Sequence, residues 1–327
     1  MHIWKSVRAF YRYWLDTLRD DEHSVMIVDS KPVAALMLTY QRRNVTVAHM
    51  VHGSHLQDAP TTPGSSTVAL RESRREVFEK LDSFDLIVVL TERQRQDITK
   101  QIETSAPIVA IPNSVDLSIT VPKGRRAAGR GIMLTSLTAR KRVDHALTAT
   151  IAARASVTVT LDVFGGGGKR AALQRQIDRA DAEAFIHLHG FNSLARLHLY
   201  RASFLLLTSA SEGISLALME SMAAGCIPIS YDVPYGPADL IRHGHNGFLV
   251  AAGDIEGLRR QIVELVEADP TRIAEIRANA IRTAADFSDE AITRQWAKAL
   301  RASRPRRPRL LSALTGKART AASRLHA

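Results

Sequence analysis

Two glutamates, Glu212 and Glu220, lie eight positions apart in the segment 208–228, TSASEGISLALMESMAAGCIP. The apolar run FLLL ends shortly before this segment, which is typical of a buried strand leaving a sheet. The spacing then predicts a turn at Glu212 and a helix over 214–224, which Gly225 ends. One carboxylate is therefore expected in a loop before a helix, and the other about two turns into that helix.

This arrangement of residues suits a sugar nucleotide. The N–H groups of Gly213, Ile214 and Ser215 would be free at the start of the helix to bind a phosphate, and the helix dipole would assist. Glu212 is then placed to hold a sugar beyond that phosphate, and Glu220 to accept the paired hydroxyl groups of a ribose. Two glutamates at this spacing also arise by chance as solvated residues. The whole string, S-x-x-E-G-x-x-L-x-x-x-E-x-M-A, is far more specific than the pair.

The string resembles the donor-binding motif of the retaining GT-B glycosyltransferases of family 4. The downstream segment ISYDVPYGPADLIRHGHNGFLV extends the resemblance. Its run YGP at 235–237, followed by Asp239, looks like the subgroup that glucosylates or GlcNAc-modifies wall teichoic acid, which includes the poly(glycerol-phosphate) alpha-glucosyltransferases. The resemblance covers most of the chain from about residue 45 and is strongest over 131–296.

The resemblance implies an enzyme that moves a hexose, glucose or GlcNAc, from a UDP-sugar to a hydroxyl acceptor with retention of configuration. The acceptor would attack on the side from which the phosphate leaves, and no metal or other cofactor would be required. Glu212 would position the sugar, Glu220 the ribose, and His52 would reach in from the opposite domain. The implied partners are UDP-glucose or UDP-GlcNAc and a glycan or polyol-phosphate acceptor.

The segment LTSLTARKRVDHAL corresponds to the family's phosphate-binding stretch, R-L-x-x-x-K. Lys141 matches the lysine, and its charge would offset the charge on the departing pyrophosphate. Ser136 stands where the family has arginine. Arg140 or Arg142 could substitute from another direction, or both could belong to an exposed charge cluster at a helix start. The departure at Ser136 favours the alternative function, a non-catalytic or degenerate GT-B-like subunit that binds a glycan or supports a partner glycosyltransferase.

The run FGGGGK at 164–169 follows a predicted strand and precedes a predicted helix, so a tight turn is expected. It matches neither a Walker loop nor a dinucleotide fingerprint. In the family that the chain resembles, the corresponding loop passes close to the donor nucleotide, which makes Gly165 and Gly166 candidate contacts. Phe191 matches the position next to the base, where it would either stack on uracil or pack against the protein.

Three histidines, His49, His52 and His55, lie at the end of a predicted strand. Strand alternation places His49 and His52 on opposite faces, so they cannot both face one site. No metal site is predicted, because no further ligand cluster is visible near them. The family resemblance favours His52 as the residue that approaches the donor sugar, with His55 second. The sequence contains no Ser-His-Asp elbow, H-E-x-x-H motif or cysteine-based metal site.

The net charge of +11 is concentrated in the C-terminal tail, since eight Lys or Arg and no acidic residues lie from Arg301 onward. The tail is interpreted either as an interfacial helix drawn to anionic lipid or a polyanionic acceptor, or as a solvated basic segment. Nucleic acid is not expected, because no aromatic residues alternate with the arginines. The single cysteine, Cys226, cannot form an internal disulfide, and a reducing cytoplasm is the simplest compartment, with peripheral contact at the inner face of the membrane.

Short β-rich runs alternate with helical patterns, including helices over 68–81 and 92–102, which predicts an α/β protein with parallel sheets. The expected fold is GT-B, with two Rossmann-like domains and a cleft between them. By comparison with the family that the chain resembles, we expect the first βαβ portion of the N-terminal domain to be missing, because an amphipathic helix opens the chain. The predicted organisation is a partial N-terminal acceptor-side domain at 1–116, a linker at 117–130, a nucleotide-sugar-binding domain at 131–285, a closing helix at 286–302 and a basic tail at 303–327.

Overall fold

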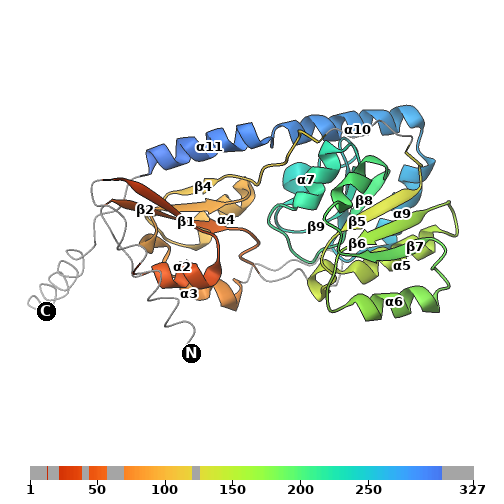
Figure 1. Ribbon diagram of the computed structural model, residues 1–327, viewed down its shortest axis with the longest axis horizontal. Coiled ribbons are helices and arrows are strands. Elements are labelled where there is room, and N and C mark those ends of the chain that lie inside the picture. The colour runs from red at the N-terminus through yellow and green to blue at the C-terminus, as the bar shows by residue number, and fades with distance from the viewer. Residues whose placement is uncertain (1–12, 14–21, 39–43, 57–69, 120–125, 304–327) are drawn as a thin grey trace, which may run out of the picture.

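The computed structural model describes most of the chain as two parallel sheets with helices around them (Figure 1). The described residues are 13, 22–38, 44–56, 70–119 and 126–303. The helix predicted at the N-terminus and the basic tail lie outside these residues, apart from Tyr13 and Ser303.

The first sheet has four parallel strands in the order β1-β2-β3-β4. Every residue of β2 and β3 is buried, as expected for strands covered on both faces of a parallel sheet. The strands cover Ser24–Val28 (β1), Val45–Val51 (β2), Leu86–Val89 (β3) and Ile108–Ala110 (β4), and the helices between them cover Lys31–Met37 (α2), Arg75–Phe78 (α3) and Glu92–Gln101 (α4).

The helix predicted over 68–81 is wrong. Leu70 forms an antiparallel bridge with Leu56, and the N–H of Arg71 donates to the carbonyl of His55 at 2.9 Å, so the chain is extended here. These tertiary contacts override the local helical pattern. Only short helical turns follow, at Glu72–Arg74 (η1), Arg75–Phe78 (α3) and Leu81–Ser83 (η2). The helix predicted over 92–102 is confirmed as α4.

The second sheet has six parallel strands in the order β10-β9-β8-β5-β6-β7. The strand order reverses between β5 and β8, which are neighbours, so the carboxyl ends of these two strands mark the switch point of the sheet. Such a switch point is where open α/β sheets bind ligands. The strands cover Arg130–Leu134 (β5), Thr160–Phe164 (β6), Ile186–Gly190 (β7), Phe204–Leu207 (β8), Ile227–Asp232 (β9) and Phe248–Ala251 (β10).

Helices cover both faces of the second sheet. Three of the later ones begin at side-chain caps: Asp254, Asp269 and Ser288 each accept a hydrogen bond from a backbone N–H of the first turn. The elements are Ala139–Lys141 (η3), Val143–Ala153 (α5), Arg170–Arg179 (α6), Ala195–Tyr200 (η4), Leu216–Ala223 (α7), Pro237–Leu240 (α8), Ile255–Glu267 (α9), Pro270–Ala285 (α10) and Asp289–Ala302 (α11).

The two sheets share one hydrophobic cluster. It contains Met50 and Val88 of the first sheet, Leu207 and Leu218 of the second half, and Ile292 of α11. Figure 1 shows α10 lying beside the second sheet and α11 continuing along the first, so the last helix of the described chain returns to the N-terminal half. The shared cluster holds the carboxyl ends of β2 and β8 near each other, which positions the site described next.

Candidate functional site

The loops after β5 and β8 are joined at the switch point. The hydroxyl of Thr208, directly after β8, donates to the carbonyls of Lys141 and Arg142 at 3.0 and 2.8 Å. The N–H of Ala210 donates to the carbonyl of Arg140 at 2.8 Å. These hydrogen bonds bring the two sequence motifs together, although they lie about seventy residues apart in the chain. The basic residues 140–142, which follow β5, and the loop after β8 that contains Glu212 (the glutamate loop, residues 208–215) therefore form one structure.

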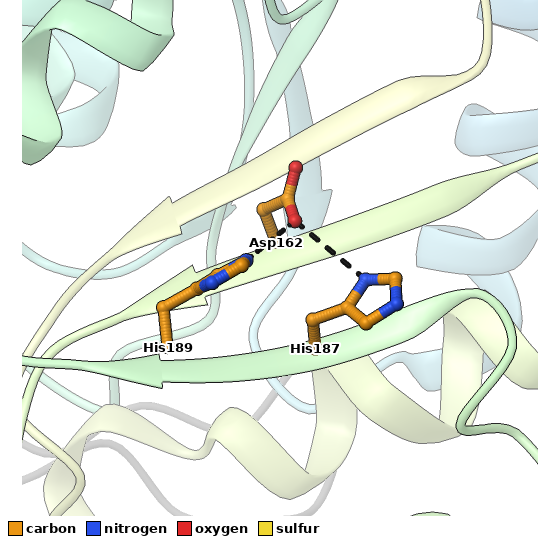
Figure 2. A group of neighbouring side chains, drawn as sticks. All are labelled: Asp162, His187 and His189. Atoms are coloured by element: carbon orange, nitrogen blue, oxygen red, sulfur yellow. Dashed lines mark hydrogen bonds and ion pairs between the residues drawn. The ribbon is translucent and has the colours of Figure 1, made fainter.

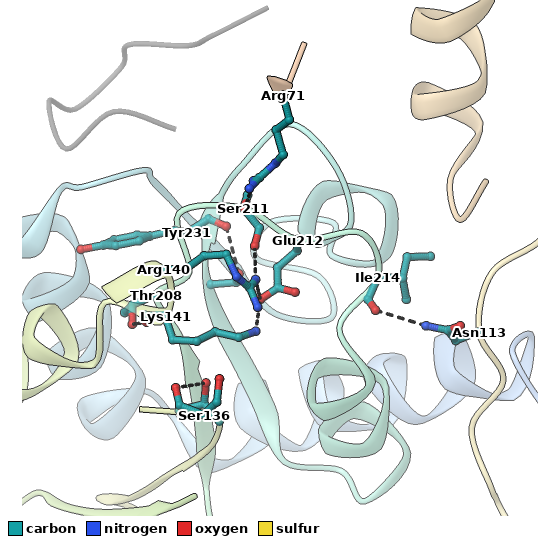
Figure 3. A network of polar contacts seen from close by, with 12 residues as sticks. Arg71, Asn113, Ser136, Arg140, Lys141, Thr208, Ser211, Glu212, Ile214 and Tyr231 are labelled. Atoms are coloured by element: carbon teal, nitrogen blue, oxygen red, sulfur yellow. Dashed lines mark hydrogen bonds and ion pairs between the residues drawn. The ribbon is translucent and has the colours of Figure 1, made fainter. Parts of the chain in front are cut away.

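Lys141 and Glu212 form an ion pair at the centre of this structure (Figure 3). Lys141 Nζ donates to Glu212 Oε1 at 2.5 Å, and Arg140 Nη1 lies 4.0 Å from the same oxygen. Arg140 Nη1 also donates to the carbonyl of Ser211 at 2.8 Å. The side chains of Glu212 and Lys141 are only 8% and 14% exposed. The carboxylate is thus fixed in a poorly hydrated place between two cations.

The helix α7 begins at Leu216, two residues later than the spacing predicted, because Ser215 is extended with φ −78° and ψ 119°. Within the described part of the chain, the N–H groups of Gly213, Ile214 and Ser215 donate to no protein acceptor. All three residues are buried. Unpaired N–H groups at a helix start, next to Lys141, are suited to bind an anion.

The first sheet closely approaches this loop at Gly213. A Cβ atom on Gly213 would lie 2.8 Å from the carbonyl oxygen of His52 and 2.7 Å from the side chain of Leu90. On the other side, Gly236 has φ +96°, and a Cβ there would lie 2.2 Å from the carbonyl oxygen of Gly213. The glutamate loop is therefore held between two other backbone segments, and no side chain fits at Gly213 or at Gly236.

Replacing Gly236 with alanine should lower the free energy of unfolding by about 2–4 kcal/mol, because a left-handed residue would acquire a side chain that collides with the Gly213 carbonyl. Urea unfolding measures this change. Gly168→Ala is the matched control, since a Cβ at Gly168 meets nothing within 4 Å. Equal stability of the two variants would contradict the close approach of Gly236 to Gly213.

The three histidines at the end of β2 have different surroundings. His49 is buried, and its pKa is lowered to about 4 by burial. His55 is buried between the rings of Phe78 and Tyr235, and burial lowers its pKa to about 4 as well. The side chain of His52 is 45% exposed, with Nε2 3.9 Å from a carboxylate oxygen of Asp29. His52 is therefore the histidine that remains accessible beside the glutamate loop.

The glycine run after β6 forms the tight turn that was predicted, between β6 and α6. Gly165 has φ +143°, and a Cβ there would lie 1.7 Å from the Thr135 carbonyl, so the turn packs on the loop after β5. A pocket of about 440 Å³ opens here, and it is lined by Gly165, Gly166, Ser136 and Phe191 among others. Phe191 is 84% exposed, so its ring is free to contact a ligand rather than packed in the core.

Glu220 lines a different, smaller pocket of about 60 Å³, together with Asp116 and Arg196. Burial raises the pKa of Glu220, and Arg196 opposes that effect. Both pockets are lined in part by η4, since Ala195 lines the larger one and Arg196 the smaller. The structure therefore places Glu220 near the Phe191 pocket but does not bring both residues into one cavity.

Several residues of the site were not predicted from the sequence. Arg71 donates to the hydroxyl of Ser211 at 2.9 Å, beside Glu212. Asn113 donates to the carbonyl of Ile214 at 3.4 Å, from the segment that leaves the first sheet (Figure 3). Nothing in the sequence marks Arg71 or Asn113 as part of this site. Both residues attach the glutamate loop to the N-terminal half.

The YGP segment that suggested the teichoic acid subgroup connects the two halves as well. The hydroxyl of Tyr235 donates to a carboxylate oxygen of Asp97 on α4 at 2.8 Å. Arg93, also on α4, makes two hydrogen bonds to Asp239, at 3.1 and 3.2 Å. The side chains of Tyr235 and Asp239 thus hold α4 against α8 and the loop before it.

Comparison with known proteins gives a match to a family model within the second half of the chain and a fold for both halves. Residues 131–286 match the family model described as glycosyl transferases group 1. The crystal structure of a variant of S. aureus TarM, in complex with fondaparinux, alpha-GlcNAc-glycerol and UDP, superposes with a TM-score of 0.79 at 24% identity. It covers 88% of this chain and 57% of the TarM chain. The predicted GT-B fold is confirmed.

Two curated relatives are similar over most of the chain. One is the GtfA subunit of the Streptococcus pneumoniae UDP-N-acetylglucosamine–peptide N-acetylglucosaminyltransferase, 26% identical over 308 residues, which are 90% of this chain and 60% of the relative. The other is the Bacillus subtilis poly(glycerol-phosphate) alpha-glucosyltransferase, 23% identical over 298 residues, 88% of this chain and 43% of the relative. The predicted resemblance to this subgroup is confirmed. The chain spans only about half the length of these relatives.

Proposed function

Because residues 131–286 form a group 1 glycosyl transferase domain in a chain of GT-B fold, we propose that the protein transfers a hexose from a UDP-sugar to a hydroxyl acceptor, with retention of configuration and without a metal ion. The observation that carries this proposal is the Lys141–Glu212 ion pair beside the unpaired N–H groups at the start of α7. The name of the S. pneumoniae relative supports a UDP-sugar donor.

The two members of the ion pair have opposite tasks in this proposal. Lys141 and the N–H groups of Gly213 to Ser215 bind the diphosphate and stabilise the negative charge that develops as it leaves. Glu212 accepts hydrogen bonds from sugar hydroxyls, and its charge stabilises the positive charge on the ring in an oxocarbenium-like transition state. His52, exposed beside Gly213, contacts the sugar from the first sheet.

The nucleoside would lie across η4. Phe191 stacks on the uracil in the larger pocket, and Gly165 and Gly166 allow the backbone to approach the nucleotide closely. Glu220, at the smaller pocket, accepts hydrogen bonds from the ribose hydroxyls. The nucleoside therefore occupies both pockets, and the diphosphate lies between these pockets and the Lys141–Glu212 ion pair.

Calorimetry with UDP-glucose and UDP-GlcNAc, together with an assay of UDP release, tests the function. Glu220→Gln should weaken binding of UDP and of either donor about 10–100-fold, because a hydrogen bond to a charged group contributes about 1.5–3 kcal/mol. Glu267→Gln on α9, an exposed glutamate, is the control and should bind as wild type. If wild-type protein binds neither donor, the transferase proposal fails and the non-catalytic subunit takes its place.

We propose a polyanionic acceptor, such as a polyol-phosphate polymer. Its support is the net charge of +11 and the polyol-phosphate acceptor for which the B. subtilis relative is named, whereas the S. pneumoniae relative is named for a peptide acceptor. Within residues 22–38, 44–56, 70–119 and 126–303, no helix combines the length and the apolar composition that a bilayer crossing requires. Contact of the basic tail with an anionic membrane remains a prediction.

A further inference from the structure

A second polar cluster uses residues that take no part in the site above. Asp162 on β6 stands opposite His187 on β7 in the register of the two strands, and His189 follows two residues along β7. Alternate residues of a strand share a face, so the pairing brings one carboxylate and two imidazoles together. Figure 2 shows the three side chains converging from the neighbouring strands.

The three side chains are spaced for a shared ion. One ligand atom from each of the three residues lies within 4.8 Å of the other two. His189 Nε2 is 2.7 Å and His187 Nδ1 is 3.7 Å from Asp162 Oδ1. Ligands of a tetrahedral zinc ion, each at about 2.0–2.1 Å, lie roughly 3.3 Å apart, so the two carboxylate–imidazole distances change by about 0.5 Å and the two imidazoles approach each other by at most about 1.5 Å. Because the two imidazoles are 47% and 40% exposed, they can move without disturbing the core.

The surroundings of Asp162 leave one oxygen available to an ion. Arg130 donates through Nε and Nη2 to Asp162 Oδ2 at 3.1 and 3.0 Å, which fixes the carboxylate with Oδ1 facing the histidines. The charge of Arg130 opposes a cation, but its side chain is 36% exposed and solvent screens it. The ring of His189 stacks on Phe164 with centroids 4.5 Å apart, which orients this ligand. A pocket of about 340 Å³ beside Arg130 and His187 has room for a further ligand.

We propose that Asp162, His187 and His189 bind a divalent transition metal of the zinc type. Two imidazoles and one carboxylate match the ligands of Zn²⁺, Co²⁺, Ni²⁺ and Cu²⁺, whereas Mg²⁺ and Ca²⁺ prefer oxygen ligands alone. Three protein ligands leave a position for water or an anion from the adjoining pocket. The ion would cross-link β7, the edge strand of the second sheet, to β6.

Titration of the full chain, produced without a histidine tag, with Zn²⁺ in a calorimeter tests this inference. One equivalent should bind with micromolar affinity or better, Mg²⁺ should not compete, and Zn²⁺ should raise the melting temperature because it binds only the folded state. His189→Gln and His187→Gln should each weaken binding by at least about 100-fold, since even second-shell partners of a metal contribute about 10–100-fold. His245→Gln, which removes an exposed histidine elsewhere, should bind as wild type.

A check of folding and the His245→Gln control distinguish loss of the Zn²⁺ site from loss of the fold. Both β7 histidines are well exposed, so their glutamine variants should fold, and circular dichroism checks this. Loss of one equivalent of Zn²⁺ in these variants, but not in His245→Gln, supports the site. Absence of binding to wild type, or equal binding by all variants, overturns it. The readout does not involve sugar transfer, so the metal site and the proposed function can fail independently.

Discussion

Replacing Glu212 with glutamine should lower the rate of UDP release from a UDP-sugar by about 10²–10³-fold, while the affinity for UDP stays within about threefold of wild type. Glutamine keeps the size and most hydrogen bonds of the side chain, so the variant removes mainly the negative charge. That charge is 8% exposed and therefore acts strongly on positive charge that develops on the sugar. When water replaces the acceptor, hydrolysis of the UDP-sugar releases UDP, and this rate can be measured without knowledge of the acceptor.

The matched control for this variant is Glu256→Gln. Glu256 is an exposed residue paired with Arg259 on α9, and its loss should leave the rate unchanged. A Glu212→Gln variant that binds UDP and retains at least half of the wild-type rate would refute the role of Glu212. A variant that no longer binds UDP would instead assign Glu212 to binding of the nucleotide, which contradicts its placement at the sugar.

Replacing Lys141 with methionine should lower the free energy of unfolding by about 3 kcal/mol, at the lower end of the cost of leaving one member of a buried ion pair alone. Arg140, whose Nη1 lies 4.0 Å from the same oxygen of Glu212, keeps the cost from being larger. The double variant Lys141→Met/Glu212→Gln should regain about 2 kcal/mol of that loss, because no uncompensated charge remains. Urea unfolding of the four proteins gives this double-mutant cycle.

An exposed ion pair on α11 provides the comparison for the buried Lys141–Glu212 pair. Arg294 and Glu290 on α11 lie 2.6 Å apart, with side chains 69% and 81% exposed. Arg294→Met should cost no more than about 0.5 kcal/mol, because exposed ion pairs contribute little. If Lys141→Met is as mild as Arg294→Met, or if the cycle shows no coupling between Lys141 and Glu212, the ion pair at the switch point does not have the buried character described above.

The central strands could be predicted from the sequence because they are short apolar runs, and parallel strands buried on both faces produce such runs. Residues 45–51 and 86–89 illustrate this. The glutamate loop could also be located, since a strand, a turn residue and an apolar helical spacing follow one another within one segment. The start of α7 was misplaced by two residues, because the backbone of Ser215 is extended although the apolar spacing begins at Ile214.

Contacts between distant segments could not be predicted. Tyr235 and Asp97 are 138 residues apart, and no local pattern signals their hydrogen bond. The same holds for the cluster at Asp162, because only the register of β6 against β7 brings His187 opposite the carboxylate. The helix expected over 68–81 failed for a related reason, since a bridge between Leu56 and Leu70 extends the chain there.

The absence of side chains at Gly213 and Gly236 makes the junction of the two halves mechanically stiff. Where side chains separate two segments, rotamer changes absorb small displacements, but here main chain rests on main chain. A rotation of the first sheet would therefore be transmitted through the carbonyl of His52 directly to the N–H groups at the start of α7. The orientation of the N-terminal half is therefore coupled, through main-chain contact, to the geometry of the anion-binding groups.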